Sequence, residues 1–154
     1  MMNIFDVNRR LKQRPPFQMI ERVTALEPGE SAVGTKTASI NDPWFSGHFP
    51  GTPILPGVLI IESCAQLCSI AADDGSGDPD RLYVLLKADN FKFLKFVLPG
   101  DVMTISVKKK SGGALVTFDA VVTVDGEIRS KGTLSFTSVA KNTLYTEETE
   151  ANPS

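Results

Sequence analysis

Residues 47–66 read GHFPGTPILPGVLIIESCAQ, and this stretch predicts a rigid loop that leads into a buried helix. Prolines at positions 50, 53 and 56 restrict the first half, so we expect an extended loop from Phe49 to Gly57. From Val58 to Ala72 nearly every residue is apolar or small, which is typical of a helix that is buried on most sides. We therefore expect one long central helix after Pro56.

Two ionisable residues stand out in this stretch. His48 is the single histidine of the chain, and Glu62 is the one ionisable carboxylate within the predicted helix. Burial disfavours the charged form of a carboxyl group, so we expect a raised pKa for Glu62 and a proton that it can donate. His48 can accept a proton, which completes an acid–base pair. The alternatives are a surface or packing histidine and a glutamate that is merely hydrogen-bonded to a neighbour such as Gln66.

The predicted start of the helix adds a third chemical group. The first amides of a helix, here those of Gly57 and Val58, have no partner within the helix and lie at the positive end of its dipole. They can hold a carbonyl oxygen while negative charge develops on it. A base, an acid and an oxyanion donor are the groups that eliminate water from a β-hydroxy carbonyl compound.

The stretch from Asn41 to Gln66 resembles the signature of FabZ-type 3-hydroxyacyl-[acyl-carrier-protein] dehydratases, a hotdog-fold family of fatty acid synthesis. The matching positions are 47–51, 53, 55–62 and 65–66, within a looser likeness over about residues 4–138. The resemblance implies an α+β hotdog fold, with an antiparallel sheet wrapped around one long buried helix. It also implies that His48 and Glu62 are the catalytic pair. Glutamate rather than aspartate at position 62 favours the FabZ type over the bifunctional FabA relatives.

The resemblance further implies how substrate is held. The amide of Gly57 is expected to bind the thioester carbonyl, and Val58, Gln66 and Phe49 are expected to complete the substrate-binding set, with Gln66 orienting Glu62. No metal or nucleotide cofactor is expected.

The implied partners are acyl carrier protein and a second copy of the chain. In the family each site combines the histidine of one subunit with the glutamate of the other, so we expect a homodimer, and association into a trimer of dimers stays open. Lys87, Lys92 and Lys95 form a basic group that is predicted to contact the acidic carrier protein. The alternative is a strand with a solvated lysine face.

Two segments depart from the family pattern. Residues 13–17 read QRPPF, where the family has His-Arg-Tyr-Pro-Phe. Leu94 and Phe96 stand where the family has a denser basic run and a proline. These differences leave open the acyl chain length and the choice between housekeeping fatty acid synthesis and a specialised polyene or polyketide pathway.

The remaining pattern predicts a single domain over residues 1–139 and a disordered tail over residues 140–154. We expect a short helix over residues 3–12 and strands over residues 17–26, 31–40, 82–86, 102–108, 114–124 and 128–139. Asp125-Gly126 predicts a two-residue hairpin between the last two strands.

Composition excludes several classes of function. A net charge of −2 and a pI of about 5.4 argue against a nucleic-acid-binding surface. The apolar runs are too short to cross a membrane, and no signal-peptide pattern is present, so we expect a cytoplasmic protein. Cys64 and Cys68 form a poor zinc site and are predicted to be reduced core residues.

Two other functions remain compatible with the sequence. The first is a hotdog acyl-thioesterase, which would aim water at the carbonyl carbon. The second is a non-catalytic acyl-binding subunit of a dehydratase pair. The presence of both His48 and Glu62 favours the dehydratase hypothesis over these two.

Overall fold

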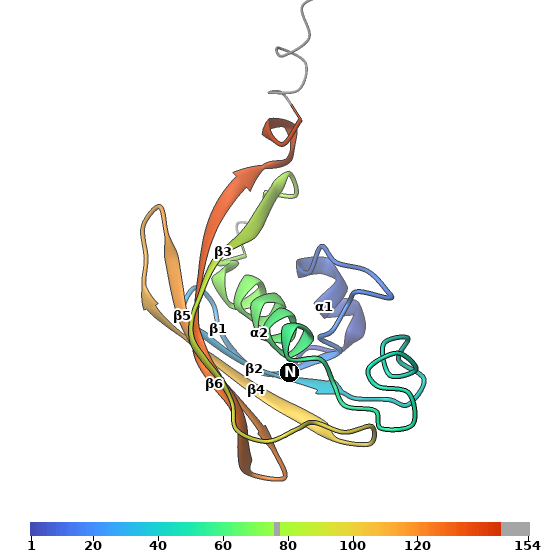
Figure 1. Cartoon of the computed structure of the whole chain (residues 1–154). Helices are drawn as coiled ribbons and strands as arrows, with labels where there is room; N and C mark the ends of the chain where they lie inside the picture. Colours follow the sequence, from blue (N-terminus) through green and yellow to red (C-terminus); the bar gives the residue numbers. More distant parts are fainter. Residues whose placement is uncertain (76–77, 146–154) are drawn as a thin grey trace, which may run out of the picture.

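A curved antiparallel sheet wraps around one helix in the computed structural model, which describes residues 1–75 and 78–145 (Figure 1). The sheet has six strands in the order β1-β2-β4-β5-β6-β3, and each neighbouring pair is antiparallel. The strands are β1 Arg22–Glu27, β2 Ser31–Thr37, β3 Arg81–Phe93, β4 Val102–Ser111, β5 Val116–Val124 and β6 Glu127–Ala140. The predicted arrangement of sheet and helix is confirmed.

The central helix is α2, Gly57–Ala72, which lies in the concave face of the sheet (Figure 1). It begins one residue earlier than predicted, because Pro56 occupies the N-cap position. Small residues let the sheet approach closely: a Cβ atom on Gly34 of β2 would lie 2.9 Å from a methyl group of Leu67. The close contact explains why the helix can be buried along most of its length.

The first helix, α1, spans Ile4–Arg10 and lies beside α2 on the side away from the sheet (Figure 1). Asn3 caps it, since its side chain accepts hydrogen bonds from the amides of Phe5 and Asp6, and the Asp6 carboxylate accepts one from the Asn3 amide. Val7 and Leu11 are buried. The helix predicted over residues 3–12 is confirmed, with a shorter span.

The first predicted strand is wrong at its beginning, because β1 begins at Arg22 and not at Phe17. The backbone before it pairs with a helix side chain instead. Met19 donates its amide hydrogen to Oε1 of Gln66, and the carbonyl of Phe17 accepts a hydrogen bond from Nε2 of the same side chain, both at 2.8 Å. A partner 47 to 49 positions away cannot be read from local periodicity.

The second predicted strand is too long, because β2 ends at Thr37 and a turn follows it. In that turn Asp42 donates its amide hydrogen to the carbonyl of Ser39 at 2.9 Å. The strand predicted over residues 82–86 is too short, because it is part of the 13-residue β3. Shifts in the pairing of β3 with β6 after Leu85 and after Asp89 break the two-residue alternation, which hid the full length of β3.

The last strands follow the sequence closely. Asp125 and Gly126 both have positive φ, at 50° and 79°, as a two-residue hairpin of this type requires. The residues of β5 and β6 that face the core are buried: Phe118, Ala120, Val122, Val124, Ser130, Leu134 and Phe136. A 3-10 helix, η1 Lys141–Thr143, follows β6. From residue 146 on, the tail that was predicted to be disordered lies outside the described residues.

Candidate active site

His48 lies in the segment between β2 and α2 and is anchored on both sides. Its amide donates to the carbonyl of Trp44 at 3.0 Å, and its carbonyl accepts from the amide of Ile54 at 2.9 Å. The prediction of an extended loop is wrong for its first part, because the amides of Phe49 and Thr52 each donate to the carbonyl of the other, at 3.2 and 2.9 Å. The chain therefore turns back before it reaches α2.

The ring of His48 has a defined protonation pattern. Its Nδ1 atom lies 2.9 Å from the carbonyl oxygen of Ile54. A carbonyl oxygen can only accept a hydrogen bond, so Nδ1 carries the hydrogen and donates it. In the neutral ring the second nitrogen, Nε2, then has a free lone pair. The ring also stacks on Phe49, with centroids 4.1 Å apart. The ring is therefore held in an orientation that leaves Nε2 able to accept a proton.

Glu62 lies in the second turn of α2 and is partly buried. Burial raises its pKa above the usual range, and a hydrogen bond from Gln66 acts in the opposite direction. The desolvation is the larger influence, so the proton is held more firmly than on an exposed glutamate. This is the behaviour that a general acid requires, and the direction agrees with the prediction.

Gln66 holds Glu62 through an amide whose two ends are fixed. Its Nε2 donates to Oε1 of Glu62 at 3.0 Å and to the carbonyl of Phe17 at 2.8 Å. Its Oε1 accepts from the amide of Met19 at 2.8 Å. A backbone amide can only donate a hydrogen bond, so the Gln66 atom that faces Met19 must be the oxygen, Oε1. The nitrogen of the Gln66 side chain, Nε2, therefore faces Glu62.

The beginning of α2 presents two backbone donors. Pro56 provides no side-chain cap, and within the described part of the chain the amides of Gly57 and Val58 donate no hydrogen bond. The ring of Phe93 covers Gly57 so closely that a Cβ atom there would lie 3.0 Å from Cζ of the ring. Sequence reasoning missed Phe93, because nothing in its local pattern points to a residue 36 positions earlier.

His48 and Glu62 are each held by a different neighbour. Across residues 1–75 and 78–145, no hydrogen bond or ion pair joins them. Each has its own support, with Ile54 holding the ring of His48 and Gln66 holding the carboxylate of Glu62. The imidazole of His48 and the carboxyl group of Glu62 are therefore oriented independently of one another within one chain.

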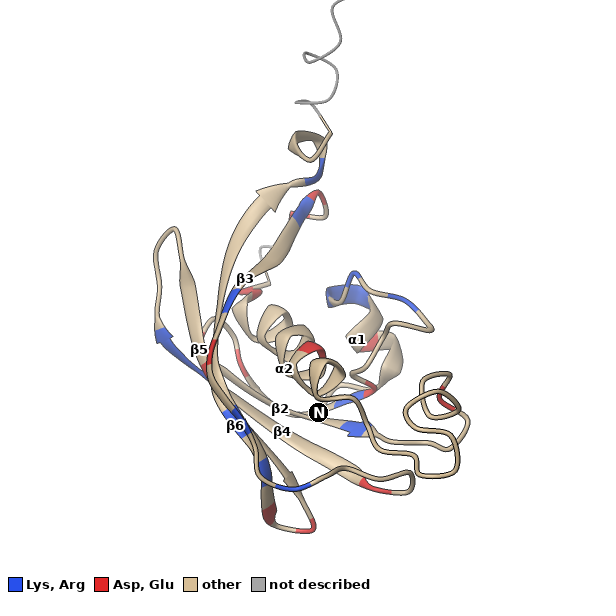
Figure 2. Cartoon of the chain, in the orientation of Figure 1, with Lys and Arg blue, Asp and Glu red and all other residues tan. Residues whose placement is uncertain are grey.

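The predicted lysine group is partly neutralised by neighbouring acids. Nζ of Lys87 lies 3.2 Å from a carboxylate oxygen of Asp89, and Nζ of Lys95 lies 2.7 Å from one of Glu127. The hydrogen bond from Lys95 is the main cause that lowers the pKa of Glu127. Lys92 is exposed on β3. β3 carries the basic residues Arg81, Lys87 and Lys92, and its acidic residue Asp89 lies between the two lysines, so the basic positions along this edge in Figure 2 do not form a continuous strip.

A separate cleft of about 290 Å³ lies at the C-terminal end of α2. Arg10 and Gln13 line it from the α1 side, and Asp73 and Tyr83 line it from the α2 and β3 sides. The hydroxyl of Tyr83 donates to the carbonyl of Ala72 at 3.4 Å. Neither His48 nor Glu62 lines this cleft, so we do not assign the chemistry to it.

Cys64 and Cys68 are free and fully buried in α2. Burial raises the pKa of the Cys64 thiol to about 12, which makes it a poor nucleophile. Among the described residues no group of three His, Cys, Asp or Glu side chains could hold a metal ion. No helix in the described ranges is long and apolar enough to cross a membrane.

Comparison with known proteins identifies the family. A FabA-like domain model matches residues 11–131. The 3-hydroxyacyl-[acyl-carrier-protein] dehydratase FabZ of Roseiflexus castenholzii is 39% identical over 137 residues, which cover 88% of this chain and 96% of that protein. The chain belongs to the FabA-like family. The FabZ of Geobacter metallireducens is 41% identical, covering 94% of this chain and all of that protein.

Solved structures of this family's fold agree with the observed architecture. The dehydratase heterocomplex ApeI:P from Xenorhabdus doucetiae superposes with a TM-score of 0.75 at 20% identity, covering 92% of this chain and 96% of that chain. A hot-dog-like protein from Thermanaerovibrio acidaminovorans gives a TM-score of 0.66 at 15% identity, covering 84% and 95%. The predicted hotdog fold is therefore confirmed.

Proposed function

We propose that this protein dehydrates (3R)-3-hydroxyacyl thioesters of acyl carrier protein to trans-2-enoyl thioesters, in fatty acid biosynthesis or a related polyene or polyketide pathway. The family membership supports the reaction class. The observation that carries the residue roles is the hydrogen bond from Nδ1 of His48 to Ile54, because it leaves Nε2 available as the base.

In the proposed reaction His48 removes one proton from the substrate and Glu62 supplies one. Nε2 of His48 removes the proton from C2, and the electrons of that bond form the double bond between C2 and C3 as the bond from C3 to the hydroxyl oxygen breaks. Glu62 gives its proton to the departing oxygen, which leaves as water. The amides of Gly57 and Val58 stabilise the charge on the thioester oxygen. His48 then loses its proton and Glu62 regains one, so no cofactor is consumed.

We further propose that the active unit is a homodimer in which His48 of one protomer acts with Glu62 of its partner. No hydrogen bond or ion pair joins these two residues within the described part of one chain, which is consistent with this assignment. The position of β3 also supports it, because this strand lies at the edge of the sheet and its Leu86 is 58% exposed. An unpaired edge strand with apolar side chains is a ready site for pairing with a second copy.

Exposed apolar side chains also surround the N-terminal end of α2. Phe49 and Val58 are exposed by 51% and 71%, and Phe96 by 69%. The amide of Leu55 donates to the carbonyl of Val97, which places the segment of Phe96 beside the entry to α2. Burial of this apolar surface would accompany both the dimer and the binding of substrate. Assembly of three dimers stays a prediction.

Acyl carrier protein is the proposed macromolecular substrate, and Lys92 is the strongest of the three predicted lysine contacts because Lys87 and Lys95 already face carboxylates. A cytoplasmic location is proposed as well. The two buried, reduced cysteines are consistent with a reducing compartment.

In the experiment that tests this function, the purified protein is incubated with acyl carrier protein that bears a 3-hydroxyacyl group of medium chain length. Loss of water from the acyl group is followed by mass spectrometry. We expect conversion by the native chain and near-complete loss in His48→Ala and in Glu62→Gln, with the fold retained. Release of free thiol instead of water would indicate a thioesterase. Binding of the acyl carrier without either product would indicate a non-catalytic subunit.

A further inference from the structure

Lys36 is a buried cation on the concave face of the sheet. It lies on β2 in line with Ala32 and Gly34, and its side chain is only 5% exposed. Moving an ammonium group out of water is costly unless nearby groups stabilise the charge. A lysine at this position therefore requires a structural or functional reason.

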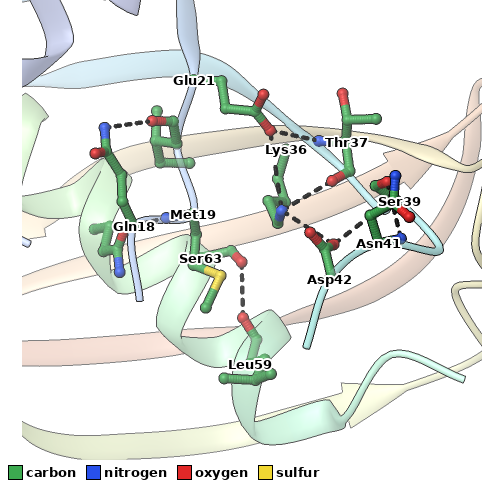
Figure 3. A network of polar contacts seen from close by, with 12 residues as sticks. Gln18, Met19, Glu21, Lys36, Thr37, Ser39, Asn41, Asp42, Leu59 and Ser63 are labelled. Carbon is green, nitrogen blue, oxygen red and sulfur yellow. Dashed lines mark hydrogen bonds and ion pairs between the residues drawn. The ribbon is translucent and has the colours of Figure 1, made fainter. Parts of the chain in front are cut away.

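The partners of Lys36 lie mainly in the segment that leads to His48 (Figure 3). Its Nζ donates to the carbonyl of Thr37 at 2.8 Å and lies 3.5 Å from a carboxylate oxygen of Asp42. The same atom lies 5.7 Å from the centre of the Trp44 ring, within the range of a cation–π contact. Glu21, at 3.9 Å, is a more exposed third partner. Lys36 thus ties β2 to two residues shortly before His48.

Hydrogen bonds within residues 39–48 connect the partners of Lys36 to the backbone of His48. The carboxylate of Asp42 that faces Lys36 also accepts the amide hydrogen of Ser39 at 3.1 Å, which closes the turn after β2. The carbonyl of Trp44 then accepts the amide hydrogen of His48 at 3.0 Å. Displacing Asp42 or Trp44 would move the carbonyl group that binds the His48 amide. The hydrogen bond between the His48 ring and Ile54 would then change in geometry.

We propose that Lys36 is a positioning residue for His48, which acts through Asp42 and Trp44 to hold the base in the tautomer and place that the reaction needs. This inference rests on the proposed role of His48 as the base. The rival explanation is that Lys36 contributes only to folding stability. The two differ in whether the state of the His48 ring depends on Lys36.

NMR signals of histidine and fluorescence of tryptophan can each be assigned to one residue, because His48 is the single histidine of the chain and Trp44 is its single tryptophan. The variant is Lys36→Met, which keeps the length of the side chain and removes its charge. Lys108→Met, an exposed lysine on the neighbouring strand β4, is the matched control. We would measure kcat and KM, the nitrogen NMR shifts of the His48 ring, the Trp44 emission and the melting temperature.

For Lys36→Met we expect kcat to fall about tenfold or more while KM changes by less than about threefold. The His48 ring should lose its preference for the hydrogen on Nδ1, and the Trp44 emission should shift. Lys108→Met should leave all of these unchanged. Adding Asp42→Asn to Lys36→Met should cost little further activity, because both changes break the same link.

A folded Lys36→Met variant with native kcat and native His48 shifts would overturn the proposal. If Lys36→Met does not fold, Asp42→Asn alone carries the test, with the same expected loss of kcat and the same shift of the His48 signals. The NMR readout requires no turnover. If the native chain does not dehydrate the substrate but Lys36→Met still changes the NMR shifts of His48, the proposed function is rejected and the positioning role is kept.

Discussion

The side-chain amide of Gln66 donates to the carboxylate of Glu62 at 3.0 Å, and its orientation is set by backbone groups of the segment before β1. Glu62 is thus subject to two opposed influences, burial that raises its pKa and a hydrogen bond that lowers it. The hydrogen bond therefore holds the carboxyl group in place and opposes part of the effect that burial has on its pKa. This balance can be shifted by changing one residue.

We predict that Gln66→Met raises the pKa of Glu62 further, since the hydrogen bond that favours the carboxylate is lost. A general acid works in its protonated form, so activity falls as the pH rises through its pKa. The alkaline limb of the kcat profile should therefore move to higher pH. The buried amide of Met19 and the partly buried carbonyl of Phe17 also lose their partner, which should lower the free energy of unfolding by about 1–3 kcal/mol. An alkaline limb that stays in place would contradict the role of Gln66.

The contact between Phe93 and Gly57 gives a second prediction. In Gly57→Ala the new methyl group would meet the Phe93 ring at 3.0 Å, so the ring or the start of α2 must shift. Overpacking of this kind costs about 1–3 kcal/mol, and displacement of the Gly57 amide would weaken its proposed hydrogen bond to the thioester oxygen. We expect a reduced kcat and a lower melting temperature.

The double variant Gly57→Ala with Phe93→Leu should recover part of both losses, because the smaller side chain makes room for the methyl group. Phe93→Leu alone serves as the control. Equal loss of kcat in the single Gly57→Ala and in the double variant would show that the ring does not limit the position of the amide.

Sharing of the site between protomers can be tested by mixing two inactive variants. In a heterodimer of His48→Ala and Glu62→Gln, one site carries both changes and the other site carries neither. Random exchange of subunits should therefore restore about one quarter of native activity, measured as loss of water after co-refolding. Activity that remains at the level of the separate variants would place both residues of a site in one chain.

The edge of β3 provides the fourth prediction. Leu86→Lys places a charge on an exposed apolar position of this strand, which should prevent pairing with a second copy. We expect a folded monomer in light scattering and a large loss of activity. Leu115→Lys, at an exposed leucine before β5, is the matched control and should change neither mass nor activity. A dimer that persists in Leu86→Lys would move the interface elsewhere.

Some features were readable from short windows of sequence. The apolar run from residue 57 to residue 72 has the length and composition of a buried helix, and Asp125-Gly126 has the backbone freedom that a two-residue hairpin needs. The chemical character of His48 and Glu62 follows from residue type and from the expected burial of the helix. These signals are local, because propensity, periodicity and turn chemistry act over a few neighbouring residues.

Features that depend on partners far away in the sequence could not be predicted from local patterns. Gln66 takes up backbone groups near residue 18 that the sequence pattern assigned to a strand, and bulges conceal the length of β3. The burial of Lys36 follows from the segment that folds over β2, and the ring of Phe93, at the end of β3, packs against Gly57. Only packing determines which segments meet. The central helix and the chemical groups that it carries are therefore predictable from local sequence, while the way in which each group is held depends on the three-dimensional fold.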